Sequence, residues 1–308
     1  MKEKRSAIIS GALAISFGAI LWGLDGIVLT PRLFNLPVAF VVFVLHAIPF
    51  VLMNLFFSKE YRRLWSLTKK DSFFLFMTSL LGGALGTLAI VKALFLVNFQ
   101  SLSVVVLLQK LQPLFAISLA AVLLGEKIKK GFLPWAALAI VAGYFLTFGL
   151  NTPNFDTGSN TGLAAIYSVL AAIAFGASTV FSRGIALTLP FQAATFLRFG
   201  ITTVIMLIIV LATDAFVSPG NITANNWLII GIIIFTTGSG AIFLYYYGLK
   251  TVPAMVASVL ELLYPISAIV FDYIFNDRVL SPVQWISAAV MIFAIVKITL
   301  PEKITRYF

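Results

Sequence analysis

Ionisable side chains lie inside long apolar runs of this 308-residue sequence, where they are costly to keep. A charge at the centre of a bilayer costs on the order of 3 kcal/mol or more, so such a residue is a functional candidate. The chain has one histidine and no cysteine, which excludes thiol chemistry and the usual zinc sites. The candidates are Asp25, His46, Lys92, Lys110, Arg198, Glu261 and Asp272.

Glu261 lies near the middle of its apolar run, the depth at which transporters usually bind solute. Glu261 and Tyr264 share a helix face because they are three residues apart. Gln109 and Gln112 repeat that spacing earlier in the chain. A proline follows each pair, so we expect both helices to kink and to free carbonyl groups for a solute. The alternative is that Glu261 pairs permanently with Lys110 as a structural bridge.

Four further residues are candidates for binding, gating or coupling. Asp25 and Lys92 lie at similar depth on the first and third runs, so they form either a gate pair or a structural pair. His46 titrates near neutral pH, which allows proton coupling, although a lone histidine also serves as a packing residue. Arg198 has a planar fork that either binds a substrate carboxylate or caps helix carbonyls.

Aromatic and small residues complete the picture of a helical site. Trp22 is placed to line a cavity with its ring, whereas the run Tyr245–Tyr247 also fits an ordinary interfacial aromatic belt. Gly82 and Gly86 are spaced for close helix packing. No phosphate-binding loop of the Walker type is present, so we expect no built-in ATPase and no cofactor.

The elements that position these residues are membrane helices. The chain is 61% hydrophobic and 10% charged, with a mean hydropathy of +1.06, whereas soluble domains are about 45–50% apolar and about 25% charged. Apolar runs of about 20 residues span a bilayer as helices. They predict an all-α integral membrane protein with ten transmembrane helices, at 7–29, 36–57, 73–97, 102–123, 132–150, 161–182, 190–212, 227–249, 253–274 and 281–300.

Basic residues cluster in alternate connections between these runs. Lysines and arginines occur at the N-terminus, in the second, fourth, sixth and eighth loops and in the tail, whereas the other loops hold only Arg32 and Arg278. The positive-inside rule therefore predicts a multi-pass protein of the cell (inner) membrane with both termini in the cytoplasm. The net charge of +10 then reflects topology and anionic lipids, and we expect no nucleic acid partner.

The two halves of the chain resemble each other. Residues 93–113 align with 245–265, each carrying a helix end, a tight connection and a new helix with a proline in the same place. Trp22-Gly23 corresponds to Phe175-Gly176, and His46 falls opposite Arg198. Repeats at 1–150 and 151–308 with five helices each must be inverted, because five is odd. Inverted repeats are typical of alternating-access transporters.

At this point the sequence resembles the EamA family of the drug/metabolite transporter superfamily. The resemblance is carried by Trp22-Gly23, by Arg198, by Pro113 with Glu126 and by Pro265 with Asp277. It implies a basket of helices around a central cavity, with the fifth and tenth helices packed at the periphery. It also implies export or exchange of small metabolites such as amino acids.

The sequence thus predicts a secondary transporter for a small polar or zwitterionic, amino-acid-like metabolite, working as a monomer or homodimer. The expected substrate-binding residues are Trp22, His46, Gln109, Lys110, Arg198, Glu261 and Tyr264, with Asp25 and Lys92 for gating or coupling. A channel is one alternative, although no ring of like charges is visible. An intramembrane lipid-modifying enzyme is the other, although its acids would need to be clustered.

Overall fold

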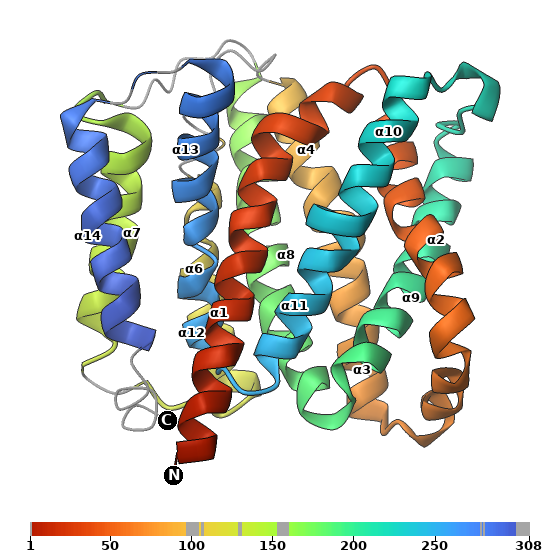
Figure 1. Cartoon of the computed structure of the whole chain (residues 1–308), viewed down its shortest axis with the longest axis horizontal. Helices are drawn as coiled ribbons and strands as arrows, with labels where there is room; N and C mark the ends of the chain where they lie inside the picture. The colour runs from red at the N-terminus through yellow and green to blue at the C-terminus, as the bar shows by residue number, and fades with distance from the viewer. Residues whose placement is uncertain are drawn as a thin grey trace.

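The computed structural model describes residues 2–96, 105, 108–128, 131–152, 160–277, 279 and 281–299, and their regular structure is helical throughout. The helices run roughly side by side along one direction (Figure 1). The first part of the chain forms α1 (Lys2–Leu24), α2 (Val38–Phe57), α3 (Lys69–Thr78), α4 (Gly86–Leu96), α6 (Gln112–Leu123) and α7 (Leu133–Phe148). The second forms α8 (Thr161–Thr188), α9 (Phe191–Ala212), α10 (Ala224–Ile233), α11 (Ser239–Leu249), α12 (Ala254–Leu260), α13 (Leu263–Asn276) and α14 (Pro282–Thr299).

Short stretches of other helix types extend or interrupt these elements. The π-helical turns are η1 (Asp25–Leu29), η4 (Ser79–Leu85) and η6 (Ile234–Gly238), and the 3-10 turns are η2 (Thr30–Leu33), η3 (Ser58–Ser66) and η5 (Pro219–Asn221). A π turn inserts an extra residue into a helix and often marks a functional position. Here η1 extends α1, η4 joins α3 to α4, and η6 joins α10 to α11.

Seven of the described helical stretches are long and apolar enough to cross a membrane. Three shorter apolar helices, at Gln112–Leu123, Leu133–Phe148 and Pro282–Ile298, accompany them. The predicted apolar runs therefore do form helices, although part of the run 102–123 lies outside the described residues. The multi-pass membrane architecture is confirmed, and the count of ten crossings stays a prediction.

Prolines and polar caps set where several helices begin. Pro37, Pro190 and Pro253 directly precede α2, α9 and α12, because proline is best tolerated at a helix start. Pro49, inside α2, is an exception. Thr68 caps α3 by accepting a 3.1 Å hydrogen bond from the Asp71 backbone N–H. These signals are local, and most predicted boundaries agree with the helices to within a few residues. The run 161–182 is an exception, since α8 continues to Thr188.

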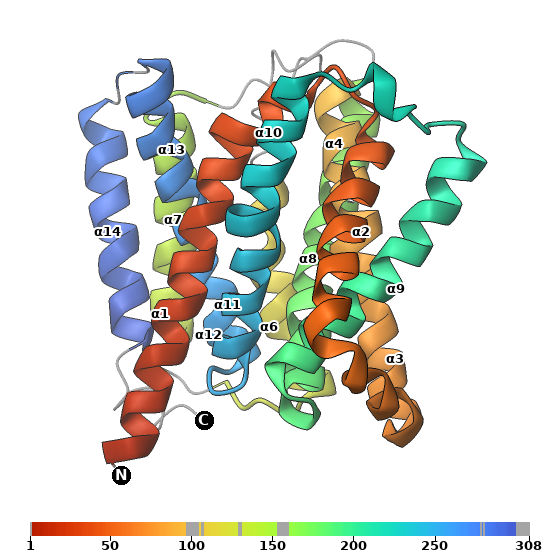
Figure 2. The same cartoon turned by 45° about the vertical axis from the view of Figure 1, so that its right-hand side comes forward.

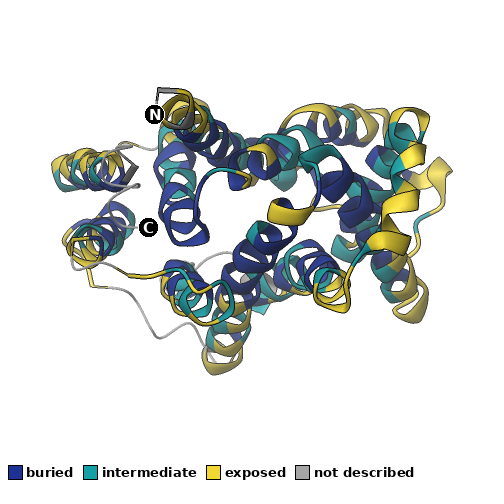
Figure 3. Cartoon of the chain, turned by 90° about the horizontal axis from the view of Figure 1, so that it is seen from below, coloured by how far each residue is buried: buried dark blue, intermediate teal, exposed yellow. Residues whose placement is uncertain are grey.

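The helix pair α7 and α14 lies at one edge of the bundle, as Figures 1 and 2 both show. The two helices pack against each other, with the rings of Trp135 and Phe293 5.7 Å apart. Elsewhere α2 packs on α9, and α1 packs on both α11 and α13. Viewed along the helices, buried residues face the interior and exposed residues the periphery (Figure 3). This agrees with the expectation of a peripheral fifth and tenth helix.

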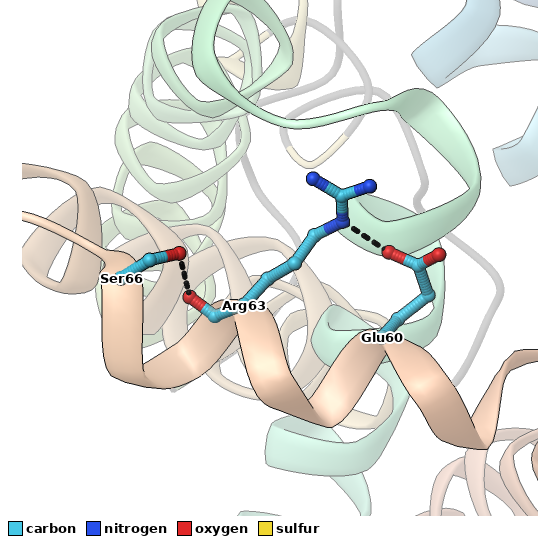
Figure 4. A network of polar contacts seen from close by, with 3 residues as sticks. All are labelled: Glu60, Arg63 and Ser66. Atoms are coloured by element: carbon cyan, nitrogen blue, oxygen red, sulfur yellow. Dashed lines mark hydrogen bonds and ion pairs between the residues drawn. The ribbon is translucent and has the colours of Figure 1, made fainter.

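The turn η3 lies at the end of the bundle where α1 begins and buries none of its residues. Arg63 donates a hydrogen bond to Glu60, and the Ser66 hydroxyl donates to the Arg63 carbonyl at 2.9 Å (Figure 4). The side chain of Trp65 is 93% exposed. A polar turn with an exposed tryptophan is suited to the membrane–water interface.

Candidate functional site

Glu261 sits at the centre of a polar cluster that joins four helical segments. Its Oε2 accepts a 2.6 Å hydrogen bond from the Gln112 amide of α6. Its Oε1 accepts from the Thr179 hydroxyl of α8 at 3.0 Å and from the Tyr245 hydroxyl of α11 at 2.6 Å. The Tyr245 hydroxyl also lies 3.0 Å from that of Thr179. A buried carboxylate is retained in an apolar bundle when donors surround it in this way.

A break between α12 and α13 places Glu261 there. Glu261 ends α12, and α13 begins two residues later at Leu263. Pro265 follows in the first turn of α13, where its missing N–H is tolerated. The equivalent break precedes α6, where Lys110 and Leu111 form a turn before Gln112. The expected interruptions of both helices are therefore present.

Aromatic rings adjoin this cluster. The ring of Trp22 on α1 lies 5.4 Å from that of Tyr245, centroid to centroid, at an interplanar angle of 57°. Tyr245 is 4% exposed and Trp22 is partly buried. The same tyrosine thus presents a ring to Trp22 and a hydroxyl to Glu261, so an aromatic surface and a hydrogen-bonding group are adjacent.

The Lys110 ammonium lies beside Gly143. A Cβ added to Gly143 of α7 would lie 3.9 Å from the Lys110 Nζ, so the ammonium faces the peripheral pair of helices. Among the described residues, no ion pair joins Lys110 to Glu261. The structural bridge between these two residues is therefore not formed, because Glu261 is occupied by Gln112 and other donors.

Asp25 and Lys92 are also apart. Asp25 in η1 accepts a 3.0 Å hydrogen bond from the Thr30 hydroxyl, whereas Lys92 is exposed on α4. Because α4 packs on α8 and not on η1, no ion pair joins them in the described part of the chain. The expected Asp25–Lys92 pair is corrected accordingly. Tyr264 lies on the Asp25 side, since a Cβ on Gly26 would lie 3.1 Å from its Oη.

His46 and Arg198 lie on the paired helices α2 and α9. His46 Nδ1 is 2.8 Å from the Val42 carbonyl oxygen, so that nitrogen carries a proton and donates it within its own helix. The His46 ring also lies 5.1 Å from that of Phe199. The Arg198 guanidinium lies 5.7 Å from the centre of the Tyr246 ring. Arg198 is 6% exposed, so this cation is held mainly over an aromatic face.

A group of buried hydroxyls lies beside Arg198. Thr78, Ser178, Ser182 and Tyr246 are joined by hydrogen bonds, including 3.1 Å between the hydroxyls of Ser182 and Tyr246. A Cβ on Gly82 would lie 3.1 Å from an Arg198 Nη atom, which brings the cation to the same place. This group joins α3, α8 and α11 through polar contacts.

The described part of the chain has two hollows, of which the smaller includes Glu261 in its lining. A cavity of about 70 Å³ lies between the two helix breaks, with Gln109, Lys110, Ser258, Glu261 and Tyr264 in its lining. A wider groove of about 520 Å³ runs along α1, α2 and α11, lined mainly by apolar and aromatic side chains including Phe17, Met53 and Phe243. Ligand pockets are typically about 300–1,000 Å³, so the groove has the size of a metabolite site.

Sequence reasoning missed Thr179, and it left Tyr245 between a cavity lining and an interfacial belt without counting it among the expected binding residues. Both lie on apolar helices, where a hydroxyl is common and carries no signal of its own. Thr179 stands one turn after Phe175, which the repeat had already marked. Continuing the repeat by one helical turn beyond Phe175 would therefore have pointed to Thr179.

Comparisons with known proteins agree with these observations. The model of the EamA-like transporter family matches residues 162–300. A Fusobacterium nucleatum protein named riboflavin transporter ImpX is 53% identical over 292 residues, 94% of this chain and 98% of that protein. An uncharacterized transporter of Synechocystis is 29% identical over 254 residues, which is 77% of this chain and 69% of that one.

A solved crystal structure has the same fold. It aligns with 96% of this chain and 98% of its own, at a TM-score of 0.73 and 17% sequence identity. A match at that identity concerns the fold alone. The family model and the relative that is 53% identical identify a transporter and not an enzyme. This chain belongs to the EamA-like transporter family of the drug/metabolite transporter superfamily.

Proposed function

We propose that this chain carries riboflavin, or a solute of the same build, across the membrane by alternating access. Riboflavin is uncharged at neutral pH and combines a flat aromatic ring system with a chain of hydroxyl groups. The observation that carries the proposal is the 53% identity, over almost the whole chain, with a protein named as a riboflavin transporter. The amino-acid-like solute expected from the sequence remains the alternative.

The chemistry around Glu261 suits such a solute. Polyols and the polar edge of a flavin need hydrogen-bonding groups, which Glu261, Gln112 and Thr179 offer at one place. A flat ring needs aromatic faces, which Trp22 and Tyr245 offer beside them. The apolar groove runs along α1 and α11, the helices that carry these rings, and is large enough for the aromatic part.

Alternating access in this proposal involves two inverted halves, residues 1–150 and 151–308, with ten crossings in all. Equivalent glycine contacts support it. A Cβ on Gly176 would lie 2.8 Å from the Gln112 carbonyl oxygen, 3.0 Å from the Ala116 nitrogen and 3.1 Å from the Phe115 Cβ. Gly176 on α8 thus allows close packing on the first turn of α6.

Gly23 makes the same contact in the other half. A Cβ there would lie 2.9 Å from the Tyr264 carbonyl oxygen, 2.8 Å from the Ala268 nitrogen and 2.0 Å from the Ser267 Oγ. When the alignment of 93–113 with 245–265 is continued along both helices, Gln112 corresponds to Tyr264, Phe115 to Ser267 and Ala116 to Ala268. The two glycines therefore contact equivalent positions of the two halves. This agreement, together with π turns in both α3–α4 and α10–α11, favours a duplicated five-helix unit.

Residue roles follow from these positions. Glu261, Gln112, Trp22 and Tyr245 bind the solute, Gln109, Lys110 and Tyr264 line the adjoining cavity, and Arg198 and His46 lie along the path. Asp25, held by Thr30 in a π turn, serves as a gate or coupling residue. In this proposal the protein lies in the cell membrane, and the end of the bundle where α1 begins faces the cytoplasm, as the basic residues of the loops at that end favour.

The test is transport in liposomes containing the purified protein. We expect saturable uptake of labelled riboflavin, and a loss of at least tenfold in Glu261→Gln, which keeps the size of the side chain but removes its charge. Glu60→Gln is the matched control, because Glu60 bonds Arg63 at the surface far from the site. Uptake of an amino-acid panel without riboflavin uptake contradicts the proposed solute, and equal riboflavin uptake by Glu261→Gln contradicts the site.

A further inference from the structure

Glu126 follows α6 and is turned out of the helix direction by a left-handed residue. Gly125 has φ +64°, a conformation that favours glycine. The Glu126 N–H bonds the Ala120 carbonyl at 3.3 Å and the Leu124 N–H bonds it at 3.0 Å, so the chain folds back over the last turn of α6 at Gly125. The sequence Gly125-Glu126 therefore ends α6 and sends the Glu126 side chain sideways.

The Glu126 carboxylate ends on the first turn of α12. Its Oε1 accepts from the Ala254 N–H at 2.8 Å and its Oε2 from the Met255 N–H at 3.0 Å. The first N–H groups of a helix have no partner within the helix, and a side chain before it usually supplies one. Here that residue is Pro253, which has no side-chain oxygen. Glu126 therefore caps a helix that cannot cap itself.

The short helix α12 links this cap to the solute site. All seven of its residues, Ala254–Leu260, are buried, and Glu261 follows directly. At 1.5 Å per residue the helix is about 10 Å long. Glu261 bonds Gln112, the first residue of α6, and Glu126 follows the last turn of α6. The helices α6 and α12 are thus tied together at both of their ends.

A second contact closes the same region. Arg183 of α8 donates a hydrogen bond to the Leu249 carbonyl at the end of α11 and interacts electrostatically with Glu126. These groups all lie toward the end of the bundle where α1 begins, since α6, α8 and α11 end there and α12 starts there. The carboxylate therefore joins elements that are far apart in sequence at one end of the molecule.

We propose that Glu126 is a positioning residue of the transport cycle, a latch that holds the start of α12, keeps Glu261 in the site and closes the end of the bundle where α1 begins. Release of the latch lets α12 move and opens the site to that side. The role rests on the proposed carrier function. It is distinct from solute binding, because Glu126 is separated from the site by the length of α12.

The experiment uses the absence of cysteine from the chain. Ser258→Cys places one thiol on α12, at a buried position that lines the cavity. A membrane-impermeant maleimide is added to one side or the other of sealed vesicles, whose orientation a protease-accessible N-terminal tag reports. We expect Glu126→Ala in this background to raise the labelling rate about tenfold, since two charge-assisted hydrogen bonds are lost. The increase should occur only when the maleimide is added on the side of the membrane where α1 begins, called here the α1-start side.

Three comparisons make the result specific. Glu60→Gln removes a carboxylate at the same end that does not contact α12, and it should leave labelling unchanged. Glu126→Gln keeps one acceptor oxygen but sets an amide NH2, which cannot accept a hydrogen bond, where the second backbone N–H needs an oxygen. Its increase should therefore be smaller than that of Glu126→Ala. Should Glu126→Ala fail to fold, Gly125→Ala decides. Its Cβ meets no atom within 4 Å, but an alanine disfavours the left-handed φ of +64° that turns Glu126 toward α12, so labelling should again rise from that side alone.

The outcomes separate this inference from the proposed function. Riboflavin binding is measured on each variant by quenching of flavin fluorescence. If riboflavin does not bind the parent, the proposed solute is wrong, and the labelling still decides the latch. Unchanged labelling in a well-folded Glu126→Ala overturns the latch, and so does an equal increase from both sides, which indicates general loosening of the bundle.

Discussion

The Tyr245 hydroxyl donates a 2.6 Å hydrogen bond to Glu261 Oε1, so the end of α11 and the end of α12 meet at one partly buried carboxylate. Only the turn from Lys250 to Pro253 and the short helix α12 separate them along the chain. A solute that replaces Tyr245 as a donor to Glu261 therefore changes how these two helices are joined. Under the proposed function, we expect binding and helix movement to be coupled at this bond.

Tyr245→Phe should lower riboflavin uptake about tenfold. The substitution removes the hydroxyl that bonds Glu261 and Thr179 but keeps the ring that packs on Trp22, and a lost hydrogen bond to a charged group costs about 1.5–3 kcal/mol. Tyr247→Phe is the control, because Tyr247 is 43% exposed and packs on Phe191. Equal loss in the two variants would argue against the bond.

Gly176→Ala should lower the thermal stability of the purified protein. A Cβ at that position would lie 2.8 Å from backbone carbonyl oxygen, and overpacking of a close contact costs about 1–3 kcal/mol. Gly231→Ala is the control, since its Cβ meets nothing within 4 Å. The measurement is the melting temperature in detergent, and an unchanged value for Gly176→Ala contradicts the close contact with α6.

Lys110→Met should leave the melting temperature unchanged or raise it. No acid pairs with Lys110 among the described residues, so removal of its charge breaks no ion pair and relieves the cost of holding a partly buried ammonium without an anionic partner. A drop in melting temperature as large as that of Gly176→Ala is the result that contradicts this account. Glu261→Gln should instead lower the melting temperature, because Gln112, Thr179 and Tyr245 all donate hydrogen bonds to the Glu261 carboxylate.

Acidification should favour the closed latch. Burial raises the pKa of the Glu126 carboxyl, although the N–H groups of Met255 and Ala254 and the charge of Arg183 act in the other direction. A raised pKa in the closed arrangement means that this arrangement binds a proton more readily than one in which the carboxyl is in water. Lowering the pH therefore stabilises closure, from the raised pKa down to the ordinary glutamate value of about 4.3.

The maleimide assay with Ser258→Cys tests this sign. Labelling from the α1-start side, corrected for the pH dependence of an exposed thiol, should fall as the pH is lowered through that window. Glu126→Gln should remove the dependence, since an amide does not titrate. A rise in corrected labelling at low pH contradicts the prediction.

Much of the fold follows from the sequence because its signals are local. Each predicted apolar run is long enough to span a bilayer, and prolines such as Pro190 and Pro253 mark helix starts one residue ahead of them. The peripheral pair α7 and α14 was implied by the family resemblance alone. The helix breaks at Gln112 and Glu261 were expected from the prolines that follow them.

The side-chain partners could not be predicted in the same way. Sequence spacing places Lys110 and Glu261 at similar depth, but depth does not say toward which neighbour a side chain points. Lys110 faces Gly143, while Glu261 faces Gln112 and Thr179. Such choices depend on how the helices are rotated about their axes, which a single sequence does not specify.

The cap that Glu126 provides for α12 also implies an order in which the helices fold, because Glu126 is synthesised well before α12. Because Pro253 offers no cap, the first turn of α12 is complete only after Glu126 has been synthesised, inserted and folded back against it. The last helices therefore mature on a scaffold supplied by the first ones. Residues 151–308 expressed by themselves would expose those N–H groups, so we expect the two parts of the chain to fold as one unit.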